Sequence, residues 1–142
     1  MSGRIVSPSN VFFACFTAYR ERDYDKALTY VAPDVRVEVH TRGAQDPSCG
    51  IYEGHAGVRL WFARVDETWA IDEREDLSAV VTDGDNVAAS TTAYGIERAT
   101  GVKVAIRTAM FLTVRDLQIV ELVEFHNLDR ISRAVQLMTS EE

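Results

Sequence analysis

Residues 75–97, EDLSAVVTDGDNVAASTTAYGIE, decide the fold class of this chain. Two runs in which apolar and polar residues alternate flank the short segment DGDN, residues 83–86. Alternation with a period of two is typical of strands, and a Gly and Asn between two such runs are typical of a hairpin turn. The segment therefore predicts two long antiparallel strands.

The same alternation continues toward the C-terminus. RATG (98–101) turns the chain into VKVAIRTAMFLTV (102–114), and RDLQ (115–118) leads into a last strand, IVELVEFHN (119–127). One further alternating run, VRVEVH (35–40), precedes the hairpin. The β-branched and aromatic residues of these runs favour strands. We therefore predict a large antiparallel sheet built mainly from the second half of the chain.

Three helices are predicted ahead of this meander. The first is capped by Ser9 or Asn10, because a short polar side chain satisfies free backbone N–H groups at a helix start. The second runs from about residue 24 to 31 and the third from about 56 to 69. Helices followed by an antiparallel meander are typical of an α+β domain. If the sheet curls strongly, the helices and the sheet enclose a cavity.

Three further segments are interpreted as connections or chain ends. TRGAQDPSCGIYEG (41–54) is rich in turn residues and is predicted to be irregular. The charges of DEREDLS (72–78) are predicted to form a solvated turn. Residues 129–137 are predicted to add a short terminal turn of helix.

Composition narrows the class of protein. We expect 142 residues to form a single domain, 1–142, with loose termini at about 1–9 and 138–142. The formal net charge of −7 argues against nucleic acid and against an anionic membrane surface as partners. No apolar run approaches the roughly 18 residues of a membrane span, and the first ten residues lack the apolar core of a signal peptide. We expect a soluble, cytoplasmic protein in which Cys15 and Cys49 are free thiols.

Three stretches resemble the SnoaL-like, nuclear transport factor 2-like superfamily. They are FFACFTAYRERDYDKALTYVAPDVRVEV (12–39), YEGHAGVRLWF (52–62) and VRDLQIVELVEFHNLD (114–129), and they cover nearly the whole chain in the right order. The resemblance implies a cone-shaped, strongly curved antiparallel sheet with three N-terminal helices that enclose a cavity. It also implies a homodimer and no cofactor or metal. These are motifs of fold rather than of chemistry, and relatives range from polyketide cyclases to binding modules without catalysis.

The resemblance also excludes some activities. Aligned with the ketosteroid isomerases, this chain has Phe16, Val39 and Met110 where that family has its Tyr, its base and its protonated acid. We therefore expect no steroid isomerase of that mechanism. Arg107 is available for the Asp–Arg–Asp set of limonene epoxide hydrolase, but no acids line up with it. The paired histidines of scytalone dehydratase are not evident.

The same alignment orients the last strand, 119–127. It places Val120, Leu122, Glu124 and His126 toward the cavity, and Ile119, Glu121, Val123, Phe125 and Asn127 toward the outer face. Glu124 and His126 are one pleat repeat apart, about 7 Å between Cα atoms, so both can address one ligand. Histidine gives or takes a proton near neutral pH, and Glu124 could orient it, raise its basicity or act as the base. The alternative is that Glu124 bonds an arginine or a backbone N–H and that His126 lies at the rim.

Two functions follow as hypotheses. The first is a cofactor-independent acid–base enzyme of the cyclase, isomerase, dehydratase or hydrolase type, acting on a hydrophobic carbonyl or epoxide compound with Glu124 and His126 as catalytic residues. The second is a non-catalytic ligand-binding or dimerisation module of the same fold. In either case we expect a small hydrophobic ligand, with Tyr19 and Tyr94 as possible hydroxyl donors. The residues predicted to contact it are Phe16, Tyr19, Trp61, Phe62, Tyr94, Met110 and Leu122.

Overall fold

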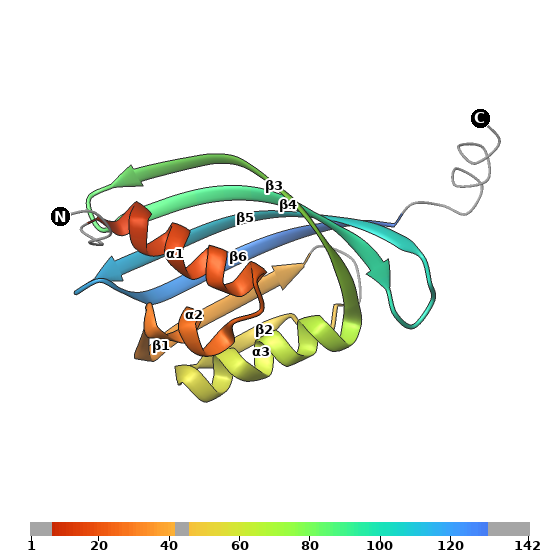
Figure 1. The fold of residues 1–142 in the computed structure, drawn as a ribbon, viewed down its shortest axis with the longest axis horizontal. Helices are drawn as coiled ribbons and strands as arrows, with labels where there is room; N and C mark the ends of the chain where they lie inside the picture. Colours follow the sequence, from red (N-terminus) through yellow and green to blue (C-terminus); the bar gives the residue numbers. More distant parts are fainter. Residues whose placement is uncertain (1–6, 42–45, 131–142) are drawn as a thin grey trace.

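The computed structural model describes residues 7–41 and 46–130, apart from the side chains of residues 73 and 74. Three helices and six strands follow one another along this part of the chain (Figure 1). Their bounds are α1 Pro8–Arg20, α2 Tyr24–Thr29, β1 Val31–Thr41, β2 Gly50–Glu53, α3 Gly54–Thr68, β3 Trp69–Asp83, β4 Asn86–Glu97, β5 Lys103–Arg115 and β6 Gln118–Arg130.

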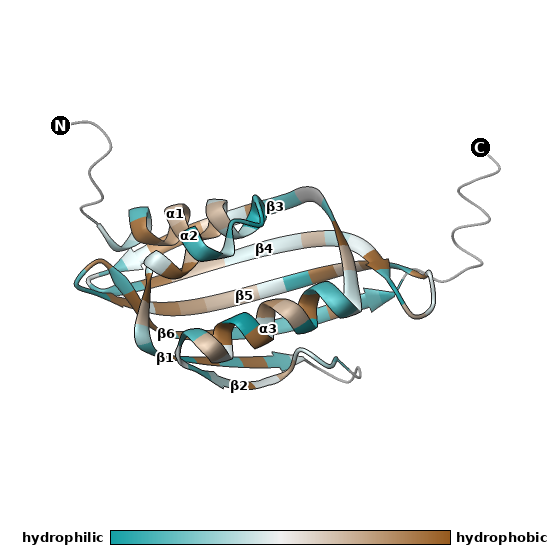
Figure 2. Ribbon diagram, turned by 60° about the horizontal axis from the view of Figure 1, so that its bottom comes forward, coloured by the Kyte–Doolittle hydropathy of each residue, from teal (hydrophilic) through white to brown (hydrophobic). Residues whose placement is uncertain are grey.

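The six strands form one strongly curved sheet in the order β2-β1-β6-β5-β4-β3. The helices lie against its concave face, and apolar and polar positions alternate along the strands (Figures 1 and 2). The predicted α+β fold with a curved sheet and three helices is confirmed. One pairing differs from the prediction, because β1 runs parallel to β6 while every other pair is antiparallel. No tight turn joins β1 to β6, so their relative direction is not imposed locally.

Local signals explain where the helices begin. The cap of α1 is Ser7, whose hydroxyl accepts from the backbone N–H of Asn10 at 3.3 Å, with Pro8 in the first turn. The predicted cap at Ser9 or Asn10 was therefore wrong, because Pro8 lacks an N–H and suits the first helical position. Asp23 caps α2 in the same way and accepts from the backbone N–H of Lys26 at 3.2 Å.

β3 is longer than the sequence predicted. It follows α3 directly at Trp69, and residues 72–78 belong to the strand, so the prediction of a solvated turn was wrong. The prediction failed because one face of this strand is exposed to solvent, and the charged residues on that face look like those of a turn. At Gly95 the backbone of β4 lies so close to β3 that an added Cβ would be 2.4 Å from the carbonyl oxygen of Ala70. Only glycine permits this approach, which accompanies a register shift of β3 at Ile71.

A bulge at Val120 changes which residues of β6 point to the inner face of the sheet. Thr113 of β5 pairs with Glu121, but the next residue of β5, Val114, pairs with Ile119, so one residue of β6 is bulged out. Ile119 is consequently buried on the inner face, and its predicted outward orientation was wrong. Beyond the bulge, the predicted parity holds, with the inner face carrying Leu122, Glu124 and His126.

The end of the described chain belongs to the sheet. Residues 129 and 130 are part of β6, so the predicted terminal helix does not begin there, and the remainder of that prediction, like the tail 138–142, lies outside the described residues. Within the described ranges, no helix has both the length and the apolar character that crossing a bilayer requires.

Candidate functional site

A cavity of about 150 Å³ lies between the concave face of the sheet and the helices. An apolar cavity of roughly this volume holds one benzene-sized ring, and a second cavity of about 60 Å³ adjoins it and extends the space toward a two-ring compound. Six of the seven predicted contact residues line it: Phe16, Tyr19, Trp61, Phe62, Met110 and Leu122. Tyr94 does not, and its hydroxyl donates to Asp76 of β3 at 3.2 Å. The cavity is thus large enough for a small cyclic compound, and its wall is mainly aromatic and aliphatic.

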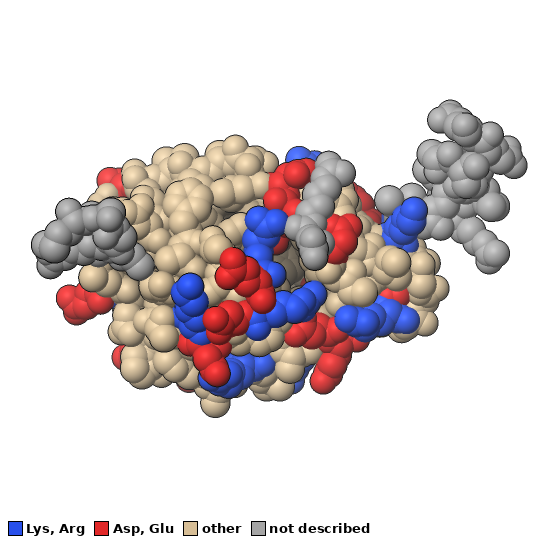
Figure 3. Space-filling model, in the orientation of Figure 1, with Lys and Arg blue, Asp and Glu red and all other residues tan. Residues whose placement is uncertain are grey.

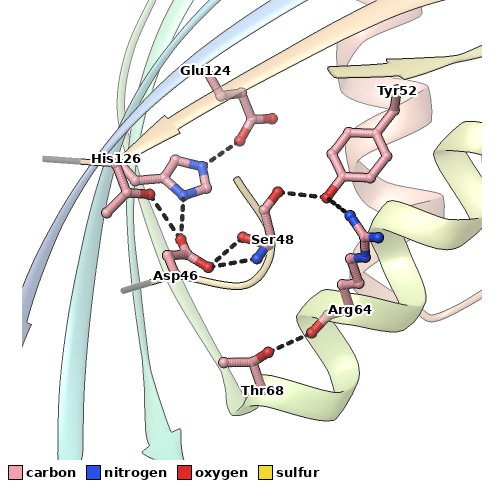
Figure 4. Close-up of polar contacts among 8 residues, drawn as sticks. Asp46, Ser48, Tyr52, Arg64, Thr68, Glu124 and His126 are labelled. Carbon is pink, nitrogen blue, oxygen red and sulfur yellow. Dashed lines mark hydrogen bonds and ion pairs between the residues drawn. The ribbon is translucent and has the colours of Figure 1, made fainter. Parts of the chain in front are cut away.

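Three ionisable side chains meet in one cluster (Figure 4), and two of them, Glu124 and His126, line this cavity. His126 Nε2 lies 2.8 Å from Glu124 Oε1, and His126 Nδ1 lies 3.7 Å from Asp46 Oδ2. The side chains are 10 % exposed for His126, 12 % for Glu124 and 3 % for Asp46. A buried imidazole is therefore held between two buried carboxylates.

Asp46 is anchored by its own short segment between β1 and β2. Its Oδ1 accepts from the Ser48 backbone N–H at 2.9 Å and from the Ser48 hydroxyl at 2.7 Å. Its Oδ2 accepts from the Thr41 hydroxyl at 2.8 Å. These donors hold a negative charge in place at the far side of the imidazole from Glu124.

The protonation state of the cluster follows from this geometry. Burial would lower the pKa of His126, but hydrogen bonding and charge from Asp46 and Glu124 outweigh burial and raise that pKa to about 9. Burial would raise the pKa of Asp46, but the ion pair with His126 and the hydrogen bonds from Ser48 and Thr41 prevail and hold that pKa well below its ordinary value. At neutral pH His126 is accordingly an imidazolium and Asp46 a carboxylate.

This arrangement assigns different roles to Glu124 and His126. Both imidazole nitrogens of His126 face carboxylates, so the ring has no nitrogen left for a ligand. Glu124 uses Oε1 for the imidazolium and lines the cavity, so its other oxygen is available there. Glu124 therefore presents a carboxylate oxygen to the cavity, and His126 holds that carboxylate through its other oxygen.

A second polar chain supports the segment that carries Asp46 (Figure 4). The hydroxyl of Tyr52 on β2 donates to the Ser48 carbonyl oxygen at 2.7 Å. Arg64 on α3 donates to that phenol oxygen at 3.2 Å, and its guanidinium also lies over the Tyr52 ring, 5.5 Å from the centroid. The position of Asp46 is thereby tied to α3 as well as to the sheet.

Two further ionisable groups face the cavity. Glu75 of β3 lines it, and its pKa is raised by burial, in spite of a hydrogen bond with Thr91 and the positive charge of Arg20. The pKa of the Tyr19 phenol is raised by burial and then by the charges of Glu124 and Glu75. The phenol therefore keeps its proton and can donate a hydrogen bond to a ligand, as the sequence suggested.

A family model describing a SnoaL-like domain matches residues 12–122. The chain belongs to the SnoaL-like domain family. No curated protein matches it by sequence. The match ends before Glu124 and His126, so these two residues lie outside it.

Solved structures support the same fold for this SnoaL-like domain. An NTF2-like protein from Burkholderia thailandensis is 20 % identical with a TM-score of 0.75, over 97 % of this chain and 99 % of that one. An NTF2-like protein from Burkholderia xenovorans is 20 % identical with a TM-score of 0.73, over 84 % and 88 %. A candidate polyketide cyclase from Xanthomonas campestris pv. campestris is 22 % identical with a TM-score of 0.66, over 83 % and 88 %. At these identities the likeness shows the fold alone.

Two residues of the site in the SnoaL-like domain were missed from the sequence. Asp46 lies in a segment interpreted as irregular, and Glu75 in one interpreted as a solvated turn. The Asp-Pro-Ser sequence at 46–48 did carry a signal, because Asp side chains often accept from the backbone N–H two residues on. That signal predicts a turn, but not that the turn lies against the last strand.

Proposed function

We propose that this SnoaL-like domain is a cofactor-independent acid–base enzyme acting on a small hydrophobic carbonyl compound, with Glu124 as the proton-transferring group. The observation that carries the proposal is the buried Asp46–His126–Glu124 cluster, which ends in one carboxylate oxygen directed at an apolar cavity. Burying three ionisable groups costs free energy, and such groups are often found where function requires them.

The chemistry follows from the groups at that end of the cavity. A Glu124 carboxylate can remove a proton from a carbon next to a carbonyl, and the carbonyl oxygen then carries the developing negative charge. The Tyr19 hydroxyl can donate a hydrogen bond to that oxygen, since it stays protonated. The resulting enolate can be protonated elsewhere, as in an isomerisation, or attack a second carbonyl, as in a cyclisation. The second outcome is the type of reaction for which the candidate polyketide cyclase of the same fold is named.

Exchange of hydrogen for deuterium in 2-indanone tests this proposal without knowledge of the substrate. This two-ring ketone has acidic C–H bonds, and their exchange in D₂O is followed by NMR. We expect the protein to accelerate exchange and the Glu124→Gln variant to lose roughly 100-fold or more of the acceleration, because general acid–base groups typically contribute about 10²–10⁴-fold. Glu121→Gln, on the outer face of the same strand, is the matched control. Equal rates for the parent and Glu124→Gln would exclude Glu124 as the base.

A specific surface feature favours the second candidate function, assembly. The convex face of the sheet is not covered by any described helix, and it exposes Phe111 of β5 and Phe125 of β6, each about half accessible to solvent. Their rings meet edge to face at 6.3 Å, and His40 stacks on Phe125 at 5.2 Å. We propose that a second copy of the chain covers this aromatic patch, because a twofold interface uses the same patch on both subunits.

The mass of the protein in solution tests this. We expect about twice the 15.9 kDa of one chain by light scattering after size exclusion, and a single-chain mass for the double variant Phe111→Glu, Phe125→Glu. A charge opposite its own copy is repulsive in a twofold interface, so the loss should be complete at micromolar concentration. Val81→Glu, at another exposed apolar position, should stay dimeric. A parent of single-chain mass would contradict the proposal.

A further inference from the structure

Glu75 occupies a place in the cavity that the proposed function does not yet use. A smaller cavity of about 60 Å³ adjoins the main one, and the two share Tyr19, Ile71 and Glu75. Figure 3 shows acidic and basic side chains gathered around a hollow on the face where α1 meets β3. The charged and phenolic groups of the smaller cavity are Tyr19, Arg20, Arg22, Tyr24, Asp66, Asp72 and Glu75. Glu75 thus lies at the junction between the apolar interior and a polar mouth.

Glu75 and Glu124 face the same space from different strands. Glu124 is on β6 and Glu75 on β3, and β5 and β4 lie between them in the sheet. The strong curvature of the sheet turns these two inner faces toward each other (Figure 1). The two carboxyl groups are close enough for their charges to interact, and both act on the buried Tyr19 phenol. Glu75, Glu124 and Tyr19, which can each exchange or donate a proton, therefore lie around the same cavity.

The surroundings of the two carboxyl groups differ in a way that suits two roles. Glu124 bonds the His126 imidazolium, a full positive charge at 2.8 Å. Glu75 has the neutral Thr91 hydroxyl as its hydrogen-bond partner, and the charge of Arg20 lowers its pKa. Burial and the nearby Glu124 favour the protonated form of Glu75. Two titratable groups in contrasting environments are the usual basis for separate acid and base roles.

We propose that Glu75 is a second catalytic residue, the general acid that protonates the ligand's oxygen at the mouth while Glu124 takes a proton from a ligand carbon in the interior. This rests on the proposed function and narrows its substrate class to small cyclic ketones that form an enol. The Glu124 carboxylate breaks a C–H bond, and the bonding electron pair forms the C=C bond of the enol. The carbonyl π electrons move to oxygen, which receives the proton of Glu75. Glu124 ends protonated and Glu75 ionised, and the reverse transfers restore both.

Two probe reactions separate the two carboxyl groups. Exchange of 2-indanone protons requires a base and is assisted by an acid on the carbonyl oxygen. Ring opening of 5-nitrobenzisoxazole requires a base only, because its leaving phenolate is stable in water. For Glu75→Gln we expect exchange to fall about 100-fold or more, within the usual contribution of a general acid, and ring opening to stay within about threefold. For Glu124→Gln we expect both reactions to fall.

The pH dependence of the exchange rate gives a second test. A purely structural role of Glu75 would not affect it. If Glu75 is the acid, the exchange rate of the parent falls as pH rises through the pKa of Glu75. This high-pH limb of the profile is absent in Glu75→Gln. The groups around Glu75 that also carry charge or a titratable proton are Tyr19, Arg20, Arg22, Tyr24, Asp66, Asp72 and Glu124. Asp76→Asn, the exposed neighbour on the same strand, is the matched control and should keep the limb.

Each outcome decides between the proposals. If Glu75→Gln leaves exchange unchanged while Glu124→Gln abolishes it, the proposed function stands and the role of Glu75 is overturned. If Glu75→Gln loses both reactions equally, Glu75 shapes the cavity and is not the acid. If the parent accelerates neither reaction, the proposed function fails. Binding of 2-naphthol, an unreactive enol analogue followed by its fluorescence, still tests Glu75 in that case, because equal affinities of the parent and Glu75→Leu would exclude contact with the ligand.

Discussion

Replacing His126 with leucine is expected to lower the free energy of unfolding by about 3–5 kcal/mol, the usual cost of removing one partner from a buried ion pair. Both carboxylates of the cluster would then lose their positive partner. Asp46 keeps its bonds from Thr41 and Ser48, but Glu124 has no other ion pair among the described residues. Urea unfolding of the parent and the variant at neutral pH measures the difference.

Glu124→Gln provides the contrast that makes this result interpretable. The amide oxygen of glutamine can still accept from His126 Nε2, and Asp46 still balances the imidazolium, so we expect a change within about 1 kcal/mol, the net value of one hydrogen bond. A loss for His126→Leu with little change for Glu124→Gln would support a positioning role for the histidine and a chemical role for the glutamate. An unchanged or higher stability of His126→Leu would contradict the prediction, because removing a buried positive partner should leave both carboxylates without it.

The elements of this fold could be predicted because their signals are local. The DGDN turn at 83–86 and the alternation on either side of it predicted the β3–β4 hairpin, which the structure contains. Alternation also placed Glu124 and His126 on the same face as Leu122, because no bulge separates these three residues. Ile119 was misplaced, because the extra residue at Val120 shifts the parity and leaves no trace in the hydrophobic pattern.

The rest of the site depends on contacts between distant segments. Asp46 meets His126 only because β1 pairs in parallel with β6, which brings Thr41 opposite His126. Glu75 reaches the cavity only because β3 continues directly from α3 and the sheet curls. Neither the β1–β6 pairing nor the curl of β3 can be predicted from the residues near Asp46 or Glu75. In the sequence, a polar residue in a turn cannot be told from a polar residue on the inner face of a strand. The family resemblance predicted the cavity, but it did not predict Asp46 or Glu75.

Alkaline pH is expected to destabilise the protein through His126. The pKa of His126 is about 9 in the folded protein against an ordinary value of 6.5. Because the folded state favours the protonated ring, the stabilisation is complete below the ordinary pKa and is lost as pH rises through the folded one. Each pKa unit corresponds to about 1.4 kcal/mol, so the loss over this window is about 3 kcal/mol.

Urea unfolding on either side of that window, at about pH 6 and pH 10, tests the sign and the size. His126→Gln is the reference, because glutamine does not titrate and other groups that ionise in this range cancel in the comparison. The parent should lose about 3 kcal/mol more than His126→Gln between the two pH values. Equal losses would mean that folding does not raise the pKa of His126, and that no imidazolium holds Glu124 above the ordinary pKa of histidine. If the loss is found, the exchange of 2-indanone should decline over the same range, because Glu124 then loses the charge that positions it.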